Sequence, residues 1–193
     1  MSKKETIWRY ILNQALEKHV LTFTQKEIAG KFQYSTSTVF NSLKAPRKLG
    51  AVEVTGRFFR IINFEKLLIL WATQRNLEKD VVYSTYCSEP ARKIEGNMPP
   101  DIIFAAFSAY RMKYNEAPAD YDVVYVYSQN LVELKKRFPT VKGIKNLFIL
   151  KPDNDLKNFG KITPDVQTFV DLWNINKWYA KDFLDALKQK FNL

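Results

Sequence analysis

Apolar residues recur along the first third of the chain with helical spacing, followed by one stretch with strand character. They come in pairs four residues apart over residues 7–16 and return at similar spacing over residues 28–46. Such spacing places side chains on one face of a helix. Residues 51–62 instead combine β-branched and aromatic residues around Gly56, which can take positive φ in a tight turn. The pattern predicts three helices and then a two-stranded β-ribbon, with a short strand before the second helix.

Capping residues indicate where these helices begin. Ser2 with Glu5, and Thr24 with Glu27, have the spacing of a capping box, in which each side chain bonds the other residue's backbone N–H. Ser35 ends a short turn and is of the type that caps a helix N-terminus. We therefore expect the second helix to begin at residue 25 and the third directly after Ser35.

Residues 24–62 resemble a winged helix-turn-helix, which has the order helix, turn, helix and β-ribbon. In the helix after the turn, Val39, Leu43 and Pro46 form an apolar stripe. Proline removes one helical hydrogen bond, so we expect a kink or a restart at Pro46. At about 100° per residue, the face opposite the stripe is polar and basic. It carries Ser37, Asn41, Lys44 and Lys48.

This polar face has the chemistry of a surface that binds double-stranded DNA. Ser37, Asn41 and Lys44 are expected to contact base edges, since Asn can pair with adenine and Lys with guanine. Hydroxyl and basic side chains beside them, and on the β-ribbon, are expected to hold phosphates and fix the register. These residues are Thr36, Arg47, Lys48, Arg57 and Arg60.

The charge distribution favours the same partner. Residues 1–63 contain 11 Lys and Arg against 4 Asp and Glu, whereas residues 64–193 contain 19 against 16. Most of the formal net charge of +10 therefore lies in the third of the chain that carries the motif. Such an excess is typical of a phosphate-binding surface. The alternative is a winged helix that binds protein, with a polar helix face that is merely solvated.

We predict an α+β winged helix-turn-helix over residues 1–63, followed by an α/β domain with a small mixed sheet. A connecting helix is expected over residues 64–79, and the second domain over residues 80–193. The helices at 64–77 and 178–191 are each candidates for a homodimer interface, and the sequence does not choose between them.

The second domain alternates strand and helix patterns. Continuous β-branched and aromatic runs predict strands at 81–86, 121–127 and 146–150. The apolar segment 101–114 is expected to be a buried helix, and the segment 88–100, rich in proline and glycine, a loop. Further helices are predicted at 130–138, from Thr163-Pro164-Asp165 to about residue 174, and at 178–191.

Several classes of protein are disfavoured by the sequence. The longest apolar runs fall far short of the roughly 20 residues that cross a bilayer, and the N-terminus lacks a signal-peptide pattern. The only cysteine, Cys87, cannot form an internal disulfide and suits a reducing compartment. We expect a cytoplasmic protein with no membrane partner.

The sequence contains only weak matches to the motifs of enzymes. Ser108 precedes Asp120 and Asp122 as in nucleotidyltransferases, which use carboxylates to hold Mg²⁺ around a triphosphate. However, Phe107 occupies the position where those enzymes need a glycine. Glu133 also follows Asp122 in a pattern similar to some nucleases, but on a predicted helix. We expect no catalytic residue, metal site or cofactor; a Mg²⁺-dependent nucleotidyltransferase or nuclease remains the less favoured alternative.

The whole chain resembles the AbiEi-like antitoxins of type IV toxin–antitoxin systems. The similarity rests on the segments FAAFSAY, VVYVYS and ITPDVQTFVDLWNINKWYAKDFLDAL after an N-terminal winged helix. Its matching positions are Ser108, Ala109, Gln167, Phe169, Asp171 and Leu172. The resemblance implies autoregulation through the operon's own promoter and a second domain that counteracts a nucleotidyltransferase-type toxin. It also implies that this domain is similar to a nucleotidyltransferase without its catalytic set.

Overall fold

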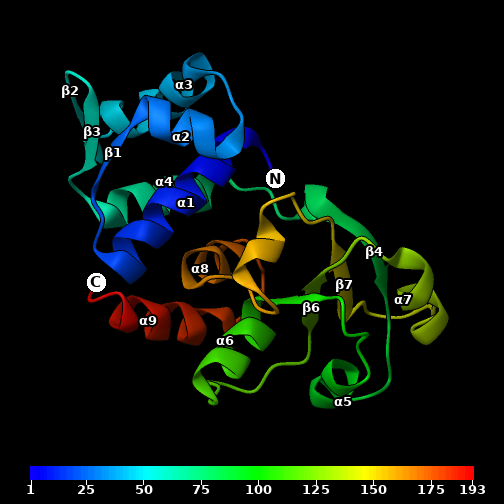
Figure 1. Ribbon diagram of the computed structural model, residues 1–193. Helices are drawn as coiled ribbons and strands as arrows, with labels where there is room; N and C mark the ends of the chain where they lie inside the picture. The colour runs from blue at the N-terminus through cyan, green and yellow to red at the C-terminus, as the bar shows by residue number, and fades with distance from the viewer. The chain divides into compact units, whose positions relative to one another are not determined.

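Residues 1–193, all described by the computed structural model, build two separate cores (Figure 1). The first unit is Met1–Arg75 and the second Asn76–Asn192. Both combine helices with a small sheet, so the α+β character expected from the sequence is confirmed. No helix has both the length and the apolar character needed to cross a membrane.

The first unit packs four helices against a three-stranded antiparallel sheet. In the sheet, β3 lies between β1 and β2, so the short strand before the second helix pairs with the β-ribbon. The elements are α1 (Lys3–Lys18), β1 (Thr22–Thr24), α2 (Gln25–Phe32), α3 (Thr36–Lys48), β2 (Val52–Thr55), β3 (Phe58–Ile61) and α4 (Phe64–Gln74). The predicted capping boxes at Ser2 and Thr24 are both present.

The helix α4 belongs to the first unit, although we expected residues 64–79 to connect the domains. It packs against α1 and α3 (Figure 1). Leu67, Leu68 and Trp71 on α4 are completely buried. Burial of such side chains stabilises a fold by about 1.5–3 kcal/mol each, which explains why the helix lies in this core.

The helix α3 continues through Pro46 to Lys48, so the helix does not restart there. Proline lacks an N–H, so the carbonyl of Ser42, four residues earlier, loses its helical partner. The indole Nε1 of Trp8 donates to this carbonyl at 3.0 Å. Trp8 is fully buried in α1. A side chain from another helix therefore replaces the hydrogen bond that Pro46 removes, and it ties α1 to α3.

Replacing Trp8 with Phe is expected to lower the free energy of unfolding of the first unit by about 1–3 kcal/mol, because it leaves a buried carbonyl without a donor. The loss should be smaller in a Pro46→Ala background, where the restored backbone N–H can bond the Ser42 carbonyl. Amide hydrogen exchange in α1 and α3 measures both costs. Equal costs in the two backgrounds would show that the indole hydrogen bond does not compensate for the proline.

The second unit contains a four-stranded mixed sheet. Its strand order is β4-β7-β6-β5, with β6 parallel to β7 and the other pairs antiparallel. The strands are β4 (Val81–Thr85), β5 (Ile103–Ala105), β6 (Val124–Tyr127) and β7 (Leu147–Leu150). The helices are η1 (Glu78–Asp80), α5 (Ala91–Gly96), α6 (Ala106–Tyr114), α7 (Leu131–Arg137), η2 (Leu156–Phe159), α8 (Asp165–Trp173) and α9 (Ala180–Lys190).

Helices cover both faces of this sheet (Figure 1). On one face α5 and α7 pack against Val124 and Val126 of β6 and against Leu147 and Ile149 of β7. On the other, α6 packs against β5, β6, α8 and α9. The three predicted strands are confirmed with narrower bounds. The central strands β6 and β7 are mostly buried, with Tyr125 and Phe148 partly exposed.

Two predictions for the second unit are wrong. The segment 88–100 contains the helix α5, and the predicted helix 101–114 begins as the strand β5. The chain turns from β5 directly into α6 at Ala106, where φ is 50°. This left-handed conformation costs a non-glycine residue about 1–2 kcal/mol, so the sheet pairing of β5 with β6 and the full burial of Ala106 hold it in place.

Candidate nucleic-acid interface

The helices α2 and α3 meet at a tight turn. Gln33 takes the left-handed conformation at the end of α2, with φ of 54°. Ser35 then caps α3, and its Oγ accepts the N–H of Thr38 at 3.2 Å. Ile28 on α2 and Val39 on α3 are fully buried. The predicted turn and cap are thus present, and they fix which side of α3 faces the core.

The outer face of α3 carries every residue predicted for it. Ser37, Asn41 and Lys44 lie within roughly 60° of one another around the helix, at about 100° per residue, and all three are exposed. Lys48 continues this row at the end of the helix, with Thr36 and Arg47 along one side, and these are also exposed.

Most of these side chains are unengaged within the protein. Ser37 Oγ lies 2.9 Å from Ser35 Oγ, so this hydroxyl already has one partner. Asn41, Arg47 and Lys48 make no side-chain hydrogen bond and no ion pair. An exposed amide and two exposed cations without partners are available to bind an acceptor-rich surface such as DNA.

Phe40 is a member of this face that the sequence analysis did not identify. Its side chain is 43% exposed, and the Lys44 ammonium lies 5.4 Å from its ring centroid. Phe40 directly follows Val39 of the apolar stripe but does not belong to the stripe. A large apolar residue outside the stripe was the sign in the sequence that this ring could be exposed. An exposed ring among polar groups can contact a thymine methyl group or an apolar patch on a protein.

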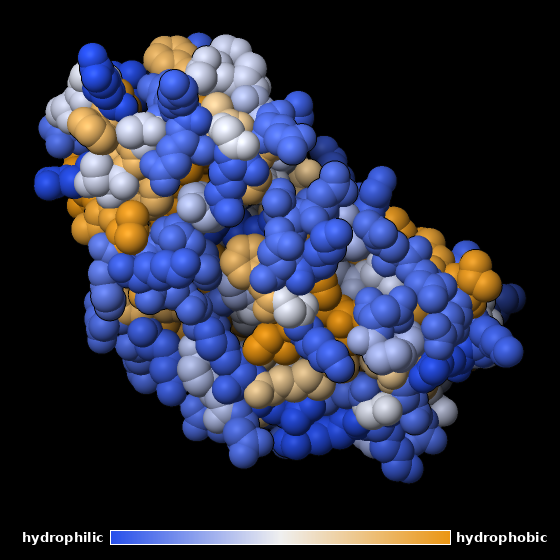
Figure 2. All heavy atoms as spheres, in the orientation of Figure 1, coloured by the Kyte–Doolittle hydropathy of each residue, from blue (hydrophilic) through white to orange (hydrophobic).

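The β2–β3 hairpin carries the other predicted basic residues. Gly56 takes a φ of 55° at its turn, followed by Arg57. Arg57 and Arg60 are both exposed, and neither forms an ion pair. Arg60 lies opposite Glu53 in the sheet register, so the positive potential at Arg60 is weaker than at Arg57. Figure 2 shows hydrophilic and apolar atoms side by side on the first unit, at the upper left. Phe58, at the start of β3, is 52% exposed.

Comparison with known proteins identifies no relative. No family model matches the chain. No curated protein and no solved structure matches it either.

In the second group of candidate residues, Phe107 is enclosed by aromatic packing, while Asp122 stays exposed but is ion-paired. Phe107 is fully buried, with ring centroids 5.0 Å from both Tyr179 and Phe183. Asp122 pairs with Lys177 at 3.0 Å and accepts a hydrogen bond from Tyr179. The structure contains no group of three or more His, Cys, Asp or Glu residues that could hold a metal ion. Phe107 is thus enclosed by aromatic rings, and the Asp122 carboxylate is already engaged by Lys177 and Tyr179.

The residues that carry the resemblance to AbiEi-like antitoxins are buried. The side chain of Gln167 donates to the Tyr127 hydroxyl at 2.9 Å, and that hydroxyl donates to Asp171 at 2.8 Å. Ser108, Phe169 and Leu172 also lie in the core. Gln167 and Asp171 therefore connect α8 to β6 through Tyr127, and the other positions contribute to the core.

Acid is expected to weaken the contact at Asp122. Burial opposes its charged form, but hydrogen bonds from Tyr179 and Lys177 outweigh this and lower its pKa. A carboxyl group whose pKa is lowered by folding stabilises the folded state at pH values above its pKa in the unfolded chain. This stabilisation is lost as the pH falls through its pKa in the folded protein. Because the side chain is 66% exposed, solvent screening limits the effect to less than about 1 kcal/mol.

The variant Asp122→Asn should therefore melt at a lower temperature than the unsubstituted protein at pH 6, and the difference should shrink towards pH 3. Thermal unfolding between pH 3 and pH 7 measures this. Asp120→Asn serves as the control, because Asp120 is exposed and has no ion pair. Identical profiles for both variants would refute a stabilising role for the Asp122 contact.

Proposed function

We propose that the protein is a sequence-specific, double-stranded-DNA-binding transcriptional regulator whose first unit is a winged helix-turn-helix. The observation that carries this proposal is the outer face of α3. Its amide, hydroxyl and basic side chains are exposed, while the opposite face is buried against the rest of the unit. A helix with one exposed polar face and one buried apolar face can enter the major groove of duplex DNA.

The roles proposed for individual residues follow from their chemistry. Asn41 is central on the face and can pair with an adenine edge through both amide atoms, while Lys44 can donate to guanine. Arg57 and Arg60 on the hairpin are long cations that can contact phosphate, as can Arg47 and Lys48 at the end of α3. The excess of 11 basic over 4 acidic residues in residues 1–63 supports binding to a polyanion.

Autoregulation is part of the proposal. The resemblance to AbiEi-like antitoxins suggests that the chain binds its own promoter in the cytoplasm and that the second unit contacts a nucleotidyltransferase-type toxin or another protein. We also propose that the second unit is a nucleotidyltransferase-like domain without activity. The buried Phe107 and the ion-paired Asp122 support that view.

A protein-binding winged helix is the second candidate, and one observation favours it. Phe40 on α3 and Phe58 on the hairpin are exposed aromatic residues, of the type found at the centres of protein interfaces. The two functions differ in their dependence on salt. DNA binding should weaken steeply as salt rises, because counterions are released from the phosphates, whereas an aromatic protein contact should not.

The test begins with selection of duplexes from a random pool by the full chain. Binding of the selected site and of a scrambled duplex is then measured by fluorescence anisotropy. Asn41→Ala is expected to weaken binding to the selected site by about 1–3 kcal/mol and to leave binding to the scrambled duplex unchanged. Arg57→Ala should weaken binding to both duplexes and reduce the salt slope by about 0.9.

The matched control is Lys18→Ala, which removes one exposed basic residue at the end of α1, outside the proposed face. It should leave both affinities and the salt slope close to those of the unsubstituted chain. An equal loss on both duplexes for Asn41→Ala would overturn its role in base recognition. Selection that enriches no duplex would overturn the proposed function.

A further inference from the structure

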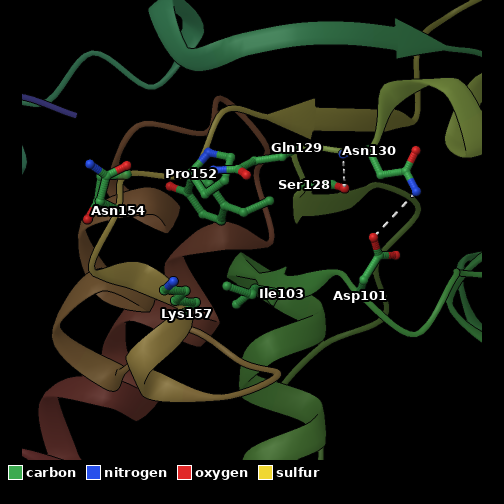
Figure 3. Close-up of a pocket in the computed structure, with 10 residues that line it drawn as sticks. Asp101, Ile103, Ser128, Gln129, Asn130, Pro152, Asn154 and Lys157 are labelled. Carbon is green, nitrogen blue, oxygen red and sulfur yellow. Dashed lines mark hydrogen bonds between the residues drawn. The ribbon is translucent and has the colours of Figure 1, made fainter.

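The second unit contains a cavity of about 770 Å³ at one edge of its sheet (Figure 3). Its walls come from the segments that follow the parallel strands β6 and β7, from the residues around the start of β5, and from η2. Ligands of sheets with parallel strands commonly bind beyond the carboxyl ends of those strands. Ligand pockets typically have volumes of about 300–1,000 Å³, so this cavity is large enough for a small molecule.

One wall presents hydrogen-bonding groups that are held in place. Ser128, only 4% exposed, accepts the backbone N–H of Asn130 at 3.0 Å, and its own hydroxyl proton has no acceptor in the protein. The Asn130 side chain caps α7 and bonds Glu133, which fixes its orientation. Its Nδ2 also donates to the carboxylate of Asp101 at 3.5 Å, as Figure 3 shows. The wall thus offers an unused hydroxyl donor at Ser128 and a carboxylate acceptor at Asp101.

The remaining walls add free polar groups and a fixed apolar surface. The side chains of Gln129, Asn154 and Lys157 line the cavity and make no hydrogen bond or ion pair within the protein. Ile103 and the half-buried Pro152 supply the apolar surface, and the buried Tyr127 borders it. The Tyr127 hydroxyl is held by Gln167 and Asp171, which fixes the end of β6 beside this surface. Donors and acceptors therefore surround a small apolar floor.

The charges of the lining decide which class of ligand fits. Asp101 and Asp153 bring two carboxylates, against the single ammonium of Lys157. This balance disfavours a phosphate group, which binding sites usually meet with several cations. Carboxylate and amide oxygens accept hydrogen bonds from hydroxyl groups, while amide N–H groups, the ammonium and the Ser128 hydroxyl donate to them.

We propose that this cavity binds a small neutral ligand rich in hydroxyl groups, either a free carbohydrate or the ribose of a nucleoside. Adjacent hydroxyls of the ligand bond Asp101 and Ser128, and further hydroxyls or ring atoms bond Gln129, Asn154 and Lys157. The ring of the ligand packs on the floor formed by Ile103 and Pro152. This site is separate from the proposed DNA-binding surface and does not depend on it.

The full chain is titrated by isothermal calorimetry with adenosine, 2′,3′-dideoxyadenosine, methyl β-D-glucopyranoside and AMP, without DNA. We expect adenosine or the glucopyranoside to bind with a Kd of about 1 mM or tighter. Binding of adenosine but not of its dideoxy analogue identifies a nucleoside site, whereas binding of the glucopyranoside alone identifies a carbohydrate site. Tighter binding of AMP than of adenosine would overturn the proposal, as would absence of binding by both neutral probes.

Variants locate the binding. Asp101→Ala and Lys157→Ala each change an exposed residue and should retain the fold, which thermal unfolding verifies. Each is expected to weaken the binding probe by about tenfold or more. Asp185→Ala, which removes an exposed carboxylate from α9, is the matched control and should leave the Kd unchanged. Equal affinities for all three variants would show that the ligand binds elsewhere and would overturn the proposal.

Discussion

Replacing Lys48, Arg57 and Arg60 together with Ala is expected to weaken binding to every duplex, by on the order of 10²-fold at 0.1 M salt. Each phosphate contact contributes about 0.9 to the slope of log affinity against log salt concentration, so the slope should fall in magnitude by about 2.7. The three side chains are exposed and unpaired, so the fold should be retained. Fluorescence anisotropy over a range of salt concentrations measures both quantities.

The control for this variant changes the same amount of charge in the second unit. Replacing Lys136, Lys142 and Lys151 with Ala also removes three exposed ammonium groups. If the basic residues of α3 and the hairpin form the contact surface, the control should retain most of the affinity and the full salt slope. Equal losses for both variants would indicate that net charge alone drives binding.

Replacing Phe107 with Ala is expected to lower the free energy of unfolding of the second unit by about 3–5 kcal/mol, the usual range for deletion of a buried aromatic ring. Its ring contacts Tyr121, Tyr179 and Phe183, with centroids 5.0–5.7 Å away. The two units need not unfold together, so a single transition is not assumed. Amide hydrogen exchange in α6 and α9 measures the free energy of opening of this core directly.

Trp178→Ala is the control for Phe107→Ala, because it removes a large aromatic side chain that is 83% exposed. Its effect should stay within about 0.5 kcal/mol, as is usual for surface positions. A loss below about 1 kcal/mol for Phe107→Ala would contradict the close packing described around α6. It would also remove one observation that supports the proposal of an inactive second unit.

The elements that the sequence predicted well are those specified by local chemistry. The caps at Ser2, Thr24 and Ser35 use side chains within three residues of the helix they begin. The sequence did not predict that β5 and α6 are separate elements. The run IIFAAF has no periodicity that distinguishes a strand from a helix. Their boundary depends on the pairing of β5 with β6 and on the positive φ of Ala106, which are tertiary effects.

Contacts between residues far apart in the sequence explain the other differences between the predicted and the observed structure. Pro46 was expected to interrupt α3, but its consequence is offset by Trp8, 38 positions earlier in the chain than the proline. The polar face of α3 was predictable because one helix supplies all of it, whereas the assignment of its residues to bases and phosphates stays a prediction. The cavity beside β6 and β7 could not be predicted, since Asp101, Asn130 and Lys157 converge on it only in the folded sheet.

Binding of the full chain to duplex DNA across several salt concentrations tests the central claim most directly. The two probes are the region upstream of the chain's own gene and a scrambled duplex of the same composition, each followed by fluorescence anisotropy. We predict tighter binding to the upstream region and an affinity that falls steeply with salt. Absence of salt-dependent binding to either duplex would contradict the proposal that α3 and the β2–β3 hairpin bind DNA.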